Sequence, residues 1–339
     1  MLFVRGGSVT FSFAQASVPL CCLKETYTVG FKVYIMDIEK DQVCVLIPTL
    51  NEEPTIGDLI QQFQDLGYSD ILVIDGKSSD RTREIAASAG AKVVIQTGKG
   101  KGNAFIQAVS LLHKPYVLLL DGDGTYDPED AADLLNPLLM GYDQSIGNRL
   151  IPDNFASFHR LNLTGNHILN WLFKVAHGRY LYDILSGYRA FTLSSLRRMH
   201  LFEEGFGIET EVSSEAVKNS DRIAVVPVKY GVRVGSVTKL DPIHDGFKIG
   251  RTIYRLAKLN NPLFYFGVIG ILIALLGAAI GVYIVSEWLK NINHIPLTLL
   301  SVTLVIVGLQ IFMFGIQSDM LLAYQREMLL EIQNMKKER

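Results

Sequence analysis

Two long stretches without a charged residue limit most strongly what this chain can fold into. They cover residues 263–285 and 297–316, and the short connector SEWLKNINHIP separates them. As helices rising about 1.5 Å per residue, both reach about 30 Å, the thickness of the hydrocarbon core of a bilayer. The sequence therefore predicts a transmembrane helical hairpin over residues 262–318. Two buried helices of a soluble protein are the alternative.

The basic residues around this hairpin predict its orientation. The connector carries only Lys290, whereas Lys and Arg cluster before the first stretch and after the second, at Lys248, Arg251, Arg255, Lys258, Arg326, Lys336, Lys337 and Arg339. Basic segments beside transmembrane helices stay on the cytoplasmic side. We therefore expect a multi-pass protein of the cell membrane, with the main domain and both termini in the cytoplasm.

A basic amphipathic helix is expected over residues 246–261, just before the first span. Its Lys and Arg residues recur at helical spacing, and Ile249, Ile253 and Leu256 fall roughly on the opposite side. This pattern favours a helix on an anionic membrane surface. A helix packed on the main domain is the alternative. The helical spacing of apolar residues in 319–339 predicts a cytoplasmic amphipathic tail. This tail would lie on the membrane or pair with another subunit, so the sequence leaves open whether the chain forms a homo-oligomer.

The composition excludes several classes of protein. A net charge of -2 over 339 residues gives no support for a nucleic-acid partner. Cys21, Cys22 and Cys44 form no CxxC or Cys/His spacing, so neither a disulfide scaffold nor a zinc site is indicated. Residues 1–35 have no clear helical or strand period, and we expect them to be disordered or an over-extended start, because Met36 opens a more natural beginning.

Between residues 43 and 235, strand-like and helix-like segments alternate. Strands are expected at VCVLIP, DILVID, KVVIQT and YVLLLD, and helices at TIGDLIQQFQDLG, RTREIAASAG and GNAFIQAVSLL. Such βαβ units predict an α/β domain over residues 36–245, whose mostly parallel sheet carries helices on both faces. Ligands of these sheets bind beyond the C-terminal ends of the strands.

Polar residues gather at those strand ends. Pro48–Glu52 follow the first strand, Asp75 the second, and Asp121 and Asp123 the fourth. Two carboxylates beside glycines suit a hard divalent cation that also takes oxygens from a diphosphate. An ordinary acidic turn is the alternative. Helix capping explains Asp127, which precedes a proline.

The segment GKGKGNAF is glycine-rich and basic, but it lacks the spacing of a P-loop. On its own it is explained by a flexible turn that leads into a helix. Beside the other strand ends, Lys99 and Lys101 would also offset phosphate charge. Both interpretations stay open.

Six motifs in order resemble one known family. IPTLNEE, VIDGKSSDRT, GKGKGNA, DGDGTYDPED, ILSGYRAF and GFGIETE are similar to motifs of the inverting family-two glycosyltransferases of the GT-A fold. Within that family, residues 43–262 resemble the polyprenyl-phosphate sugar synthases, and most closely the archaeal dolichyl-phosphate hexosyltransferases of S-layer protein N-glycosylation. The resemblance implies metal-dependent transfer of one hexose or N-acetylhexosamine from a nucleotide sugar, with UDP favoured, to dolichyl or polyprenyl phosphate. The product would supply lipid-linked sugar for protein N-glycosylation.

The resemblance also implies roles for single residues. Asp75 would hold the base or ribose, Asp121 the ribose and the metal-bound phosphates, and Asp123 would be the main ligand of Mg²⁺ or Mn²⁺. The nucleotide pocket would further include Pro48, Asn51, Glu52 and Lys101. The acceptor phosphate would lie near Arg149, Ser186, Arg189 and Arg233. The sequence departs from its relatives at two positions. Gly76 follows Asp75, where many relatives have a second aspartate, and Thr125 stands where many mannose synthases have a glutamine.

Several alternatives stay open beside this function. One is a dolichyl-phosphate mannose synthase that uses GDP-mannose, and another is a non-catalytic membrane scaffold of the same fold. A processive polysaccharide synthase would need more spans and a QxxRW motif, and a cytoplasmic nucleotidyltransferase would lack the hairpin. Asp183 either orients an arginine or acts as a base. Glu209 and Glu211 either face the pocket or cap a helix.

Overall fold

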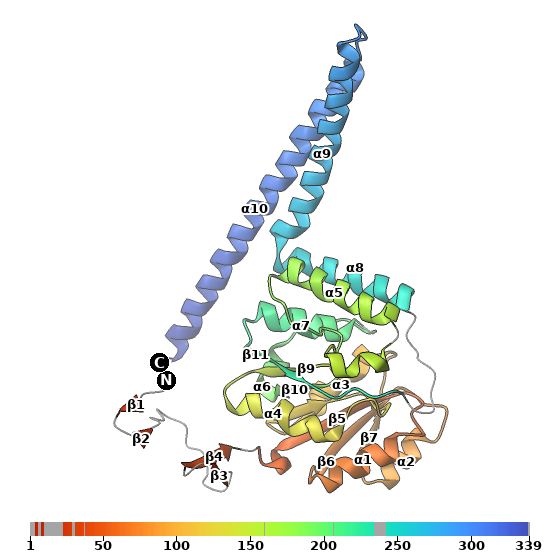
Figure 1. Cartoon of the computed structure of the whole chain (residues 1–339), viewed down its shortest axis with the longest axis vertical. Coiled ribbons are helices and arrows are strands. Elements are labelled where there is room, and N and C mark those ends of the chain that lie inside the picture. Colours follow the sequence, from red (N-terminus) through yellow and green to blue (C-terminus); the bar gives the residue numbers. More distant parts are fainter. Residues whose placement is uncertain are drawn as a thin grey trace.

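The computed structural model describes residues 38–158, 160–205, 207–233 and 242–337, and before them four short strands (Figure 1). These are β1 (Val4–Arg5), β2 (Ser8–Val9), β3 (Leu23–Thr28) and β4 (Phe31–Met36), with β1 paired to β2 and β3 paired to β4, both antiparallel. The sequence did not indicate these strands, and the expectation that residues 1–35 are disordered or an over-extended start stays a prediction. Threonine, valine and aromatic side chains in β3 and β4 favour extended backbone, although their periodicity is weak. The rest of that segment lies outside the described residues.

A seven-stranded sheet forms the centre of the main domain. Its order is β11-β9-β10-β8-β5-β6-β7, and β10 alone in this sheet runs antiparallel to its neighbours. The strands are β5 (Val43–Thr49), β6 (Asp70–Asp75), β7 (Lys92–Ile95), β8 (Tyr116–Leu119), β9 (Gln144–Asn148), β10 (Arg189–Thr192) and β11 (Ile223–Pro227). The predicted mostly parallel sheet is therefore confirmed.

Helices cover both faces of the sheet and bury two hydrophobic clusters. Alternate residues of β5 show the division, because Leu46 packs with Phe105 and Phe191 on one face and Ile47 packs with Phe63 on the other. Burial on both faces explains why the strand is apolar from Val43 to Pro48. The helices around the sheet are α1 (Ile56–Asp65), α2 (Thr82–Ser88), α3 (Lys101–Leu111), α4 (Ala131–Leu139), α6 (Leu193–Arg198) and α7 (Ile208–Lys218). Short 3-10 helices lie between elements, namely η2 (Lys40–Gln42), η3 (Pro128–Asp130) and η4 (Pro152–Ser157).

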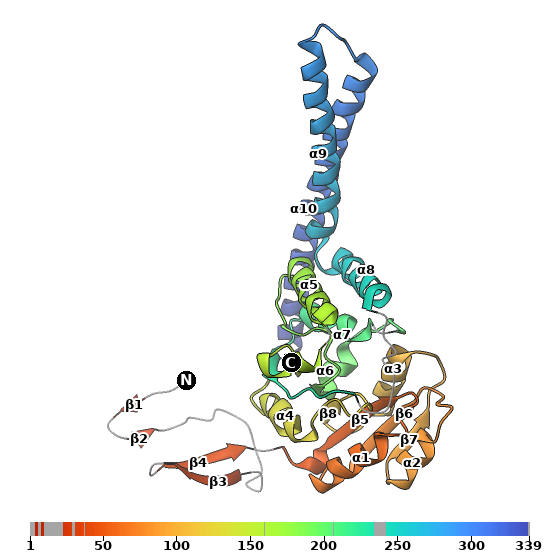
Figure 2. The same ribbon diagram turned by 45° about the vertical axis from the view of Figure 1, so that its right-hand side comes forward.

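Two further helices, α5 (Arg160–His177) and α8 (Pro242–Asn260), lie side by side between the sheet domain and the C-terminal helices (Figures 1 and 2). Ile249, Ile253 and Leu256 of α8 are buried. The apolar side of α8 thus packs on the main domain, which is the alternative that the sequence left open. Lys248 and Arg251 remain exposed on this helix.

The C-terminal hairpin consists of α9 (Pro262–Trp288) and α10 (Ile295–Lys337). Both helices are long and apolar enough to cross a membrane, over Pro262–Trp288 and Ile295–Gln325. They approach closely at glycines, since a Cβ on Gly270 would lie 2.6 Å from the carbonyl oxygen of Gly308. Ser301 Oγ donates a hydrogen bond of 2.8 Å to the Gly277 carbonyl. Small residues and a hydroxyl at the contact are typical of helices that pair in lipid.

Candidate active site

A cavity of about 1100 Å³ lies at the C-terminal ends of β5, β6 and β8, where the sequence predicted a ligand. It also extends between α5 and α8, whose residues line its other end. The predicted site residues that line it are Pro48, Glu52, Lys101, Asp121, Asp123, Arg149 and Arg233. The structure therefore brings most of the predicted set to one cavity.

Lys101, the first residue of α3, joins two carboxylates. Its ammonium contacts Asp121, and its Nζ lies 2.5 Å from Glu209 Oε1. Burial alone would lower the pKa of Lys101, but the charges of Asp121 and Glu209 outweigh it and raise that pKa well above its ordinary value. Gly187 leaves room for this arrangement, because a Cβ there would overlap the Asp121 carboxylate. Glu209 therefore faces the pocket, as one of its two interpretations held.

Asp123 lies beside a second cation, Arg233. Its Oδ1 accepts hydrogen bonds from the Thr125 amide (3.2 Å) and hydroxyl (2.7 Å). Arg233 Nη1 lies 3.6 Å from Asp123 Oδ2, and Arg233 Nη2 lies 2.6 Å from Glu52 Oε1. Arg233 thus links the segments that follow β5 and β8. These contacts are with carboxylates at the strand ends, and its predicted place near an acceptor phosphate stays a prediction.

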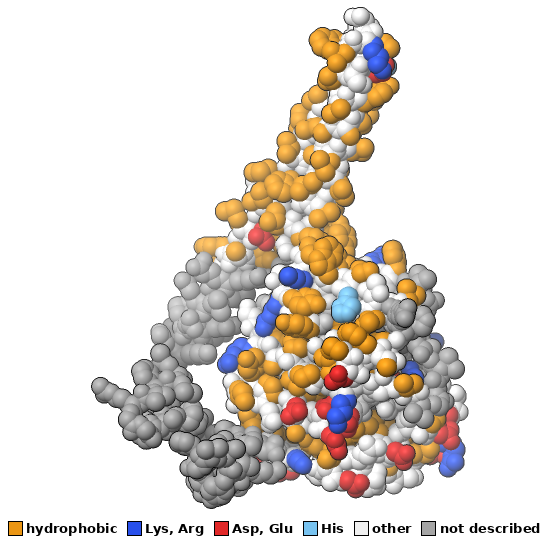
Figure 3. Space-filling view, in the orientation of Figure 1, with side chains coloured by type: hydrophobic (Ala, Val, Ile, Leu, Met, Phe, Trp, Pro, Cys, Tyr) orange, Lys and Arg blue, Asp and Glu red, His pale blue; other side chains and the backbone are white. Residues whose placement is uncertain are grey.

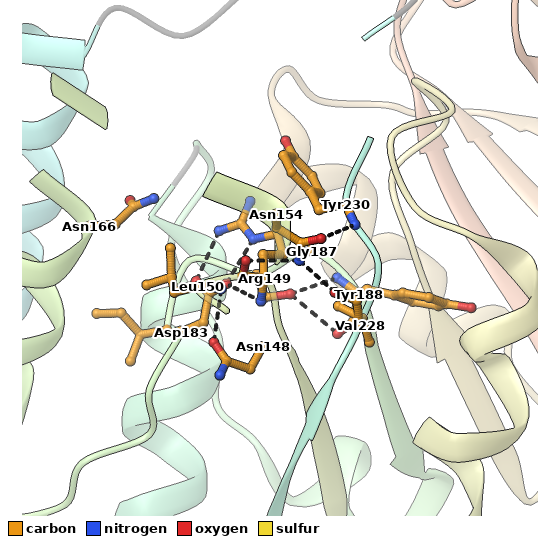
Figure 4. A network of polar contacts seen from close by, with 12 residues as sticks. Asn148, Arg149, Leu150, Asn154, Asn166, Asp183, Gly187, Tyr188, Val228 and Tyr230 are labelled. Carbon is orange, nitrogen blue, oxygen red and sulfur yellow. Dashed lines mark hydrogen bonds and ion pairs between the residues drawn. The ribbon is translucent and has the colours of Figure 1, made fainter. Parts of the chain in front are cut away.

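Arg149 is held at the cavity wall by Asp183 (Figure 4). Its Nε and Nη2 donate to the two Asp183 oxygens at 2.8 and 2.9 Å. Burial opposes its charge, but the Asp183 carboxylate outweighs burial and raises the pKa of Arg149. The rings of Tyr230 and Phe158 lie 5.2 and 5.8 Å from its guanidinium carbon. Asp183 therefore orients an arginine, which was one of its two predicted roles.

A buried amide fixes the segment that carries Tyr230 (Figure 4). Asn154 donates to the carbonyls of Arg149 (3.0 Å) and Val228 (2.7 Å), and it accepts from the Tyr230 amide (3.1 Å). The aromatic ring is therefore held over Arg149 by backbone contacts. Sequence patterns did not indicate Asn154, Tyr230 or Phe158, because the three come from segments without a motif.

Two predicted nucleotide residues do not line the cavity. Asp75 is fully buried, and its carboxylate accepts from the Ser78 amide (2.9 Å) and hydroxyl (2.5 Å). Asn51 has a φ of 52° and accepts from the Ser79 amide at 2.8 Å. Both side chains bind the loop after β6, so their predicted direct contact with a nucleotide is not supported by their positions.

Two predicted acceptor residues, Ser186 and Arg189, are fully buried and do not line this cavity. Arg189 lies behind it, where it lines a small pocket with Lys101 and Glu209. Arg189 donates to the carbonyls of Ser186 (2.9 Å) and Ile184 (2.7 Å) and to Ser213 Oγ (3.0 Å). Burial lowers the pKa of Arg189 to about 10. Ser186 is fully buried, and its Oγ accepts from the Tyr188 amide at 3.3 Å. Arg189 thus binds the loop beside Asp183, and the predicted roles of Arg189 and Ser186 at an acceptor phosphate stay predictions.

Asp121 and Asp123 fit a divalent cation whose remaining ligands come from a bound molecule. Among the described residues, no group of three or more Asp, Glu, His or Cys side chains is arranged to hold a metal. Two carboxylates supply hard oxygen ligands, and a diphosphate can supply others. In the structure, Lys101 and Arg233 place positive charge beside these carboxylates. The donor set is therefore suited to a cation that binds together with its phosphate ligand.

The end of the cavity between α5 and α8 is mainly apolar. Its lining includes Phe158, Leu161, Leu169, Leu185 and Ile249. On α5, Leu161, Ile168, Trp171 and Val175 recur at helical spacing and are exposed, Ile168 by 57% and Trp171 by 60%. Leu161 and Ile168 also line the cavity, so this stripe borders its opening. The sequence analysis did not predict this exposed stripe. The spacing of seven, three and four residues between these apolar side chains was the signal that could have found it.

Comparisons with known proteins agree with the fold. Residues 44–201 match the family model described as Glycosyl transferase family 2. The chain is 46% identical over 298 residues to Glycosyltransferase AglJ of Haloferax volcanii, covering 87% of this chain and 98% of that protein. It is 33% identical over 218 residues to the Dolichyl-phosphate hexose transferase of the same organism, covering 64% of this chain and 94% of that one.

A solved structure has the same fold. It is glucosyl-3-phosphoglycerate synthase from Mycobacterium tuberculosis in complex with Mn²⁺, UDP-glucose and phosphoglyceric acid. The two chains are 25% identical, with a TM-score of 0.51, and the match covers 63% of this chain and 79% of that one. The GT-A fold, the family match and these relatives together identify a glycosyltransferase. The chain belongs to glycosyl transferase family 2.

Proposed function

We propose that the chain transfers one hexose or N-acetylhexosamine, with inversion, from a UDP-sugar to dolichyl or polyprenyl phosphate at the cytoplasmic face of the cell membrane. One observation carries the proposal. The same cavity has carboxylates and cations at the strand ends and an apolar wall from α5 and α8 at its other end. A nucleotide sugar suits the first end and an isoprenoid phosphate suits the second.

The polar end would take the donor. Asp121 and Asp123 would hold Mg²⁺ or Mn²⁺, which when bound supplies a Lewis acid that neutralises the charge of the departing diphosphate. Lys101 would exchange its contact with Asp121 for a phosphate oxygen, while Glu209 keeps its ammonium in place. Arg233 would likewise turn from Asp123 toward phosphate. These charged groups act in a partly buried site, where electrostatic stabilisation is strong.

The acceptor would approach from the apolar end. A lipid phosphate is already ionised at neutral pH, so it needs a positioned cation more than a strong general base. Arg149 lies at the cavity wall with its orientation fixed by Asp183, and arginine matches phosphate geometry. A relative named Dolichyl-phosphate hexose transferase, which matches 64% of this chain, supports this acceptor class.

The membrane would hold this entrance at the headgroup level. The exposed apolar residues of α5 lie near the base of the hairpin. Figure 3 shows hydrophobic side chains in this part of the surface. Lys174 of α5 and Lys248 and Arg251 of α8 are exposed near these apolar side chains. An apolar stripe with basic neighbours suits the surface of an anionic bilayer. Lipid-linked sugar made there would serve protein N-glycosylation, including that of an S-layer.

A transfer assay tests the proposal. Membranes that contain the chain receive labelled UDP-glucose, UDP-N-acetylglucosamine or GDP-mannose with dolichyl phosphate, and the glycolipid is identified by mass. We expect product from a UDP-sugar and loss of product with a chelator. Product from GDP-mannose alone would identify a mannose synthase instead. No glycolipid from any donor, with intact nucleotide binding, would favour a non-catalytic scaffold and contradict the proposal.

A further inference from the structure

We infer that Glu203 is a positioning residue that connects Lys101 of the active site to the membrane-proximal helix α8. The inference rests on the proposed function in one respect, namely that Lys101 contacts the donor phosphates. It arises from the GKGKG motif, whose glycines are not explained by a P-loop. It is carried by contacts of the segment that precedes α7.

The glycines beside Lys101 admit another part of the backbone. A Cβ on Gly100 would overlap the carbonyl of Glu204, and a Cβ on Gly102 would overlap the carbonyl of Glu203. The Gly102 amide donates a hydrogen bond of 3.0 Å to the Glu204 carbonyl, which also accepts from Asn103 at 3.4 Å. The start of α3 therefore rests on Glu203 and Glu204. Its amide groups bind protein rather than a phosphate.

The segment is in turn fixed by α7 and α8. Glu211 Oε2 accepts from the amides of Phe202 (2.9 Å) and Glu203 (2.7 Å). The Glu203 carboxylate lies 2.6 Å from Arg255 Nη2 on the outer side of α8, and Thr252 Oγ1 lies 3.5 Å from it. The Glu203 side chain is 22% exposed, and that of Arg255 is 62% exposed. One residue thus joins α8 to the backbone that supports Lys101.

The position of Lys101 follows from these contacts. Its ammonium reaches both Asp121 and Glu209 only while the start of α3 keeps its place against Glu203 and Glu204. A change at the Arg255–Glu203 pair should therefore appear at the start of α3. A lost surface cation, by contrast, should change only attraction to the membrane.

A matched pair of variants separates these effects. Arg255→Gln and Arg251→Gln remove the same charge from α8 one turn apart, and both arginines are exposed. The full chain is placed in nanodiscs that contain anionic lipid, without donor, and hydrogen exchange is followed for a peptide that covers residues 98–105. Exposed ion pairs are weak, so we expect exchange at Gly102 and Asn103 to accelerate about two- to fivefold in Arg255→Gln. Arg251→Gln should match the wild type.

Further variants distinguish positioning from a general loss of structure. Glu203→Gln should accelerate exchange as Arg255→Gln does, the double variant should add nothing, and Arg255→Lys should restore protection. In transfer assays, the KM for the nucleotide sugar should rise by about the same two- to fivefold factor, while the KM for the lipid phosphate stays at the Arg251→Gln value.

Equal exchange in Arg255→Gln and Arg251→Gln would overturn the inference. So would acceleration across the whole domain, because that result would indicate partial unfolding. The exchange comparison needs no donor. A chain that transfers no sugar to lipid phosphate would therefore contradict the proposed function while the exchange result still decides the role of Glu203.

Discussion

At the scale of single residues, two acidic side chains in one loop have different roles. Asp123 lines the cavity beside Arg233, whereas Asp127 accepts from the Glu129 amide at 3.0 Å and caps a short helical turn. We expect Asp123→Ala to lower transfer by about a hundredfold or more, as for a lost electrostatic stabiliser. Asp127→Ala should keep transfer and lose about 1 kcal/mol of stability. Initial rates with added Mn²⁺ and melting temperatures measure both.

Results that would contradict this assignment are specific. Transfer by Asp123→Ala at the wild-type rate in the presence of chelator would remove the metal from the reaction. Transfer lost equally in Asp127→Ala, at an unchanged melting temperature, would place the function in the whole acidic loop instead of at the cavity.

Residue types at strand ends could be predicted, but the direction of each side chain could not. The apolar run before Asp121 and Asp123 already indicated a strand that ends at a ligand site, and both residues line the cavity. Asp75 also follows a strand, yet Ser78 captures its carboxylate within the loop. Arg189 is buried by neighbours that are distant in sequence, such as Ser213. Local patterns do not contain such tertiary contacts.

At the scale of elements, α5 is the helix whose exposed apolar stripe was not predicted from the sequence. Its exposed Trp171 is a reporter, because the chain has only two tryptophans. In a Trp288→Phe variant in nanodiscs, we expect Trp171 fluorescence to be quenched by lipids brominated near the headgroup and to be shielded from iodide. The Trp171→Phe variant, which keeps Trp288 at the end of α9, is the control for a hairpin residue.

The opposite fluorescence result would contradict membrane contact of α5. Trp171 emission that iodide quenches freely and brominated lipid leaves unchanged would mean that the α5 stripe stays in water. The acceptor would then have to reach the cavity by another route.

The contact between α5 and the main domain predicts a pH dependence of stability. His177 at the end of α5 is buried, 4.4 Å from the Phe173 ring centre, and burial lowers its pKa to about 4. An unfolded chain binds a proton at this residue below about pH 6.5, whereas the folded chain resists it. Stability from this group is therefore full above that pH and falls by up to about 3 kcal/mol as the pH drops toward 4.

Melting temperatures between pH 7.5 and 5 measure this effect. His177→Phe should flatten the pH dependence, since it keeps the aromatic contact and removes the titrating group. A variant that keeps the full slope would assign the acid sensitivity to other groups, such as carboxylates of the cavity.

At the scale of the whole molecule, the proposed function requires the cavity to lie on the same side of the membrane as the nucleotide sugar. The basic residues beside the hairpin predict a cytoplasmic domain and an external connector. Single cysteines test this prediction in a chain whose Cys21, Cys22 and Cys44 are replaced. Asn293→Cys in the connector and Glu84→Cys on α2 are both at exposed positions. A membrane-impermeant maleimide should label the first in intact cells and the second only after lysis. Labelling of Glu84→Cys in intact cells would place the cavity outside, where UDP-sugars are absent, and the donor assignment would fail with the orientation.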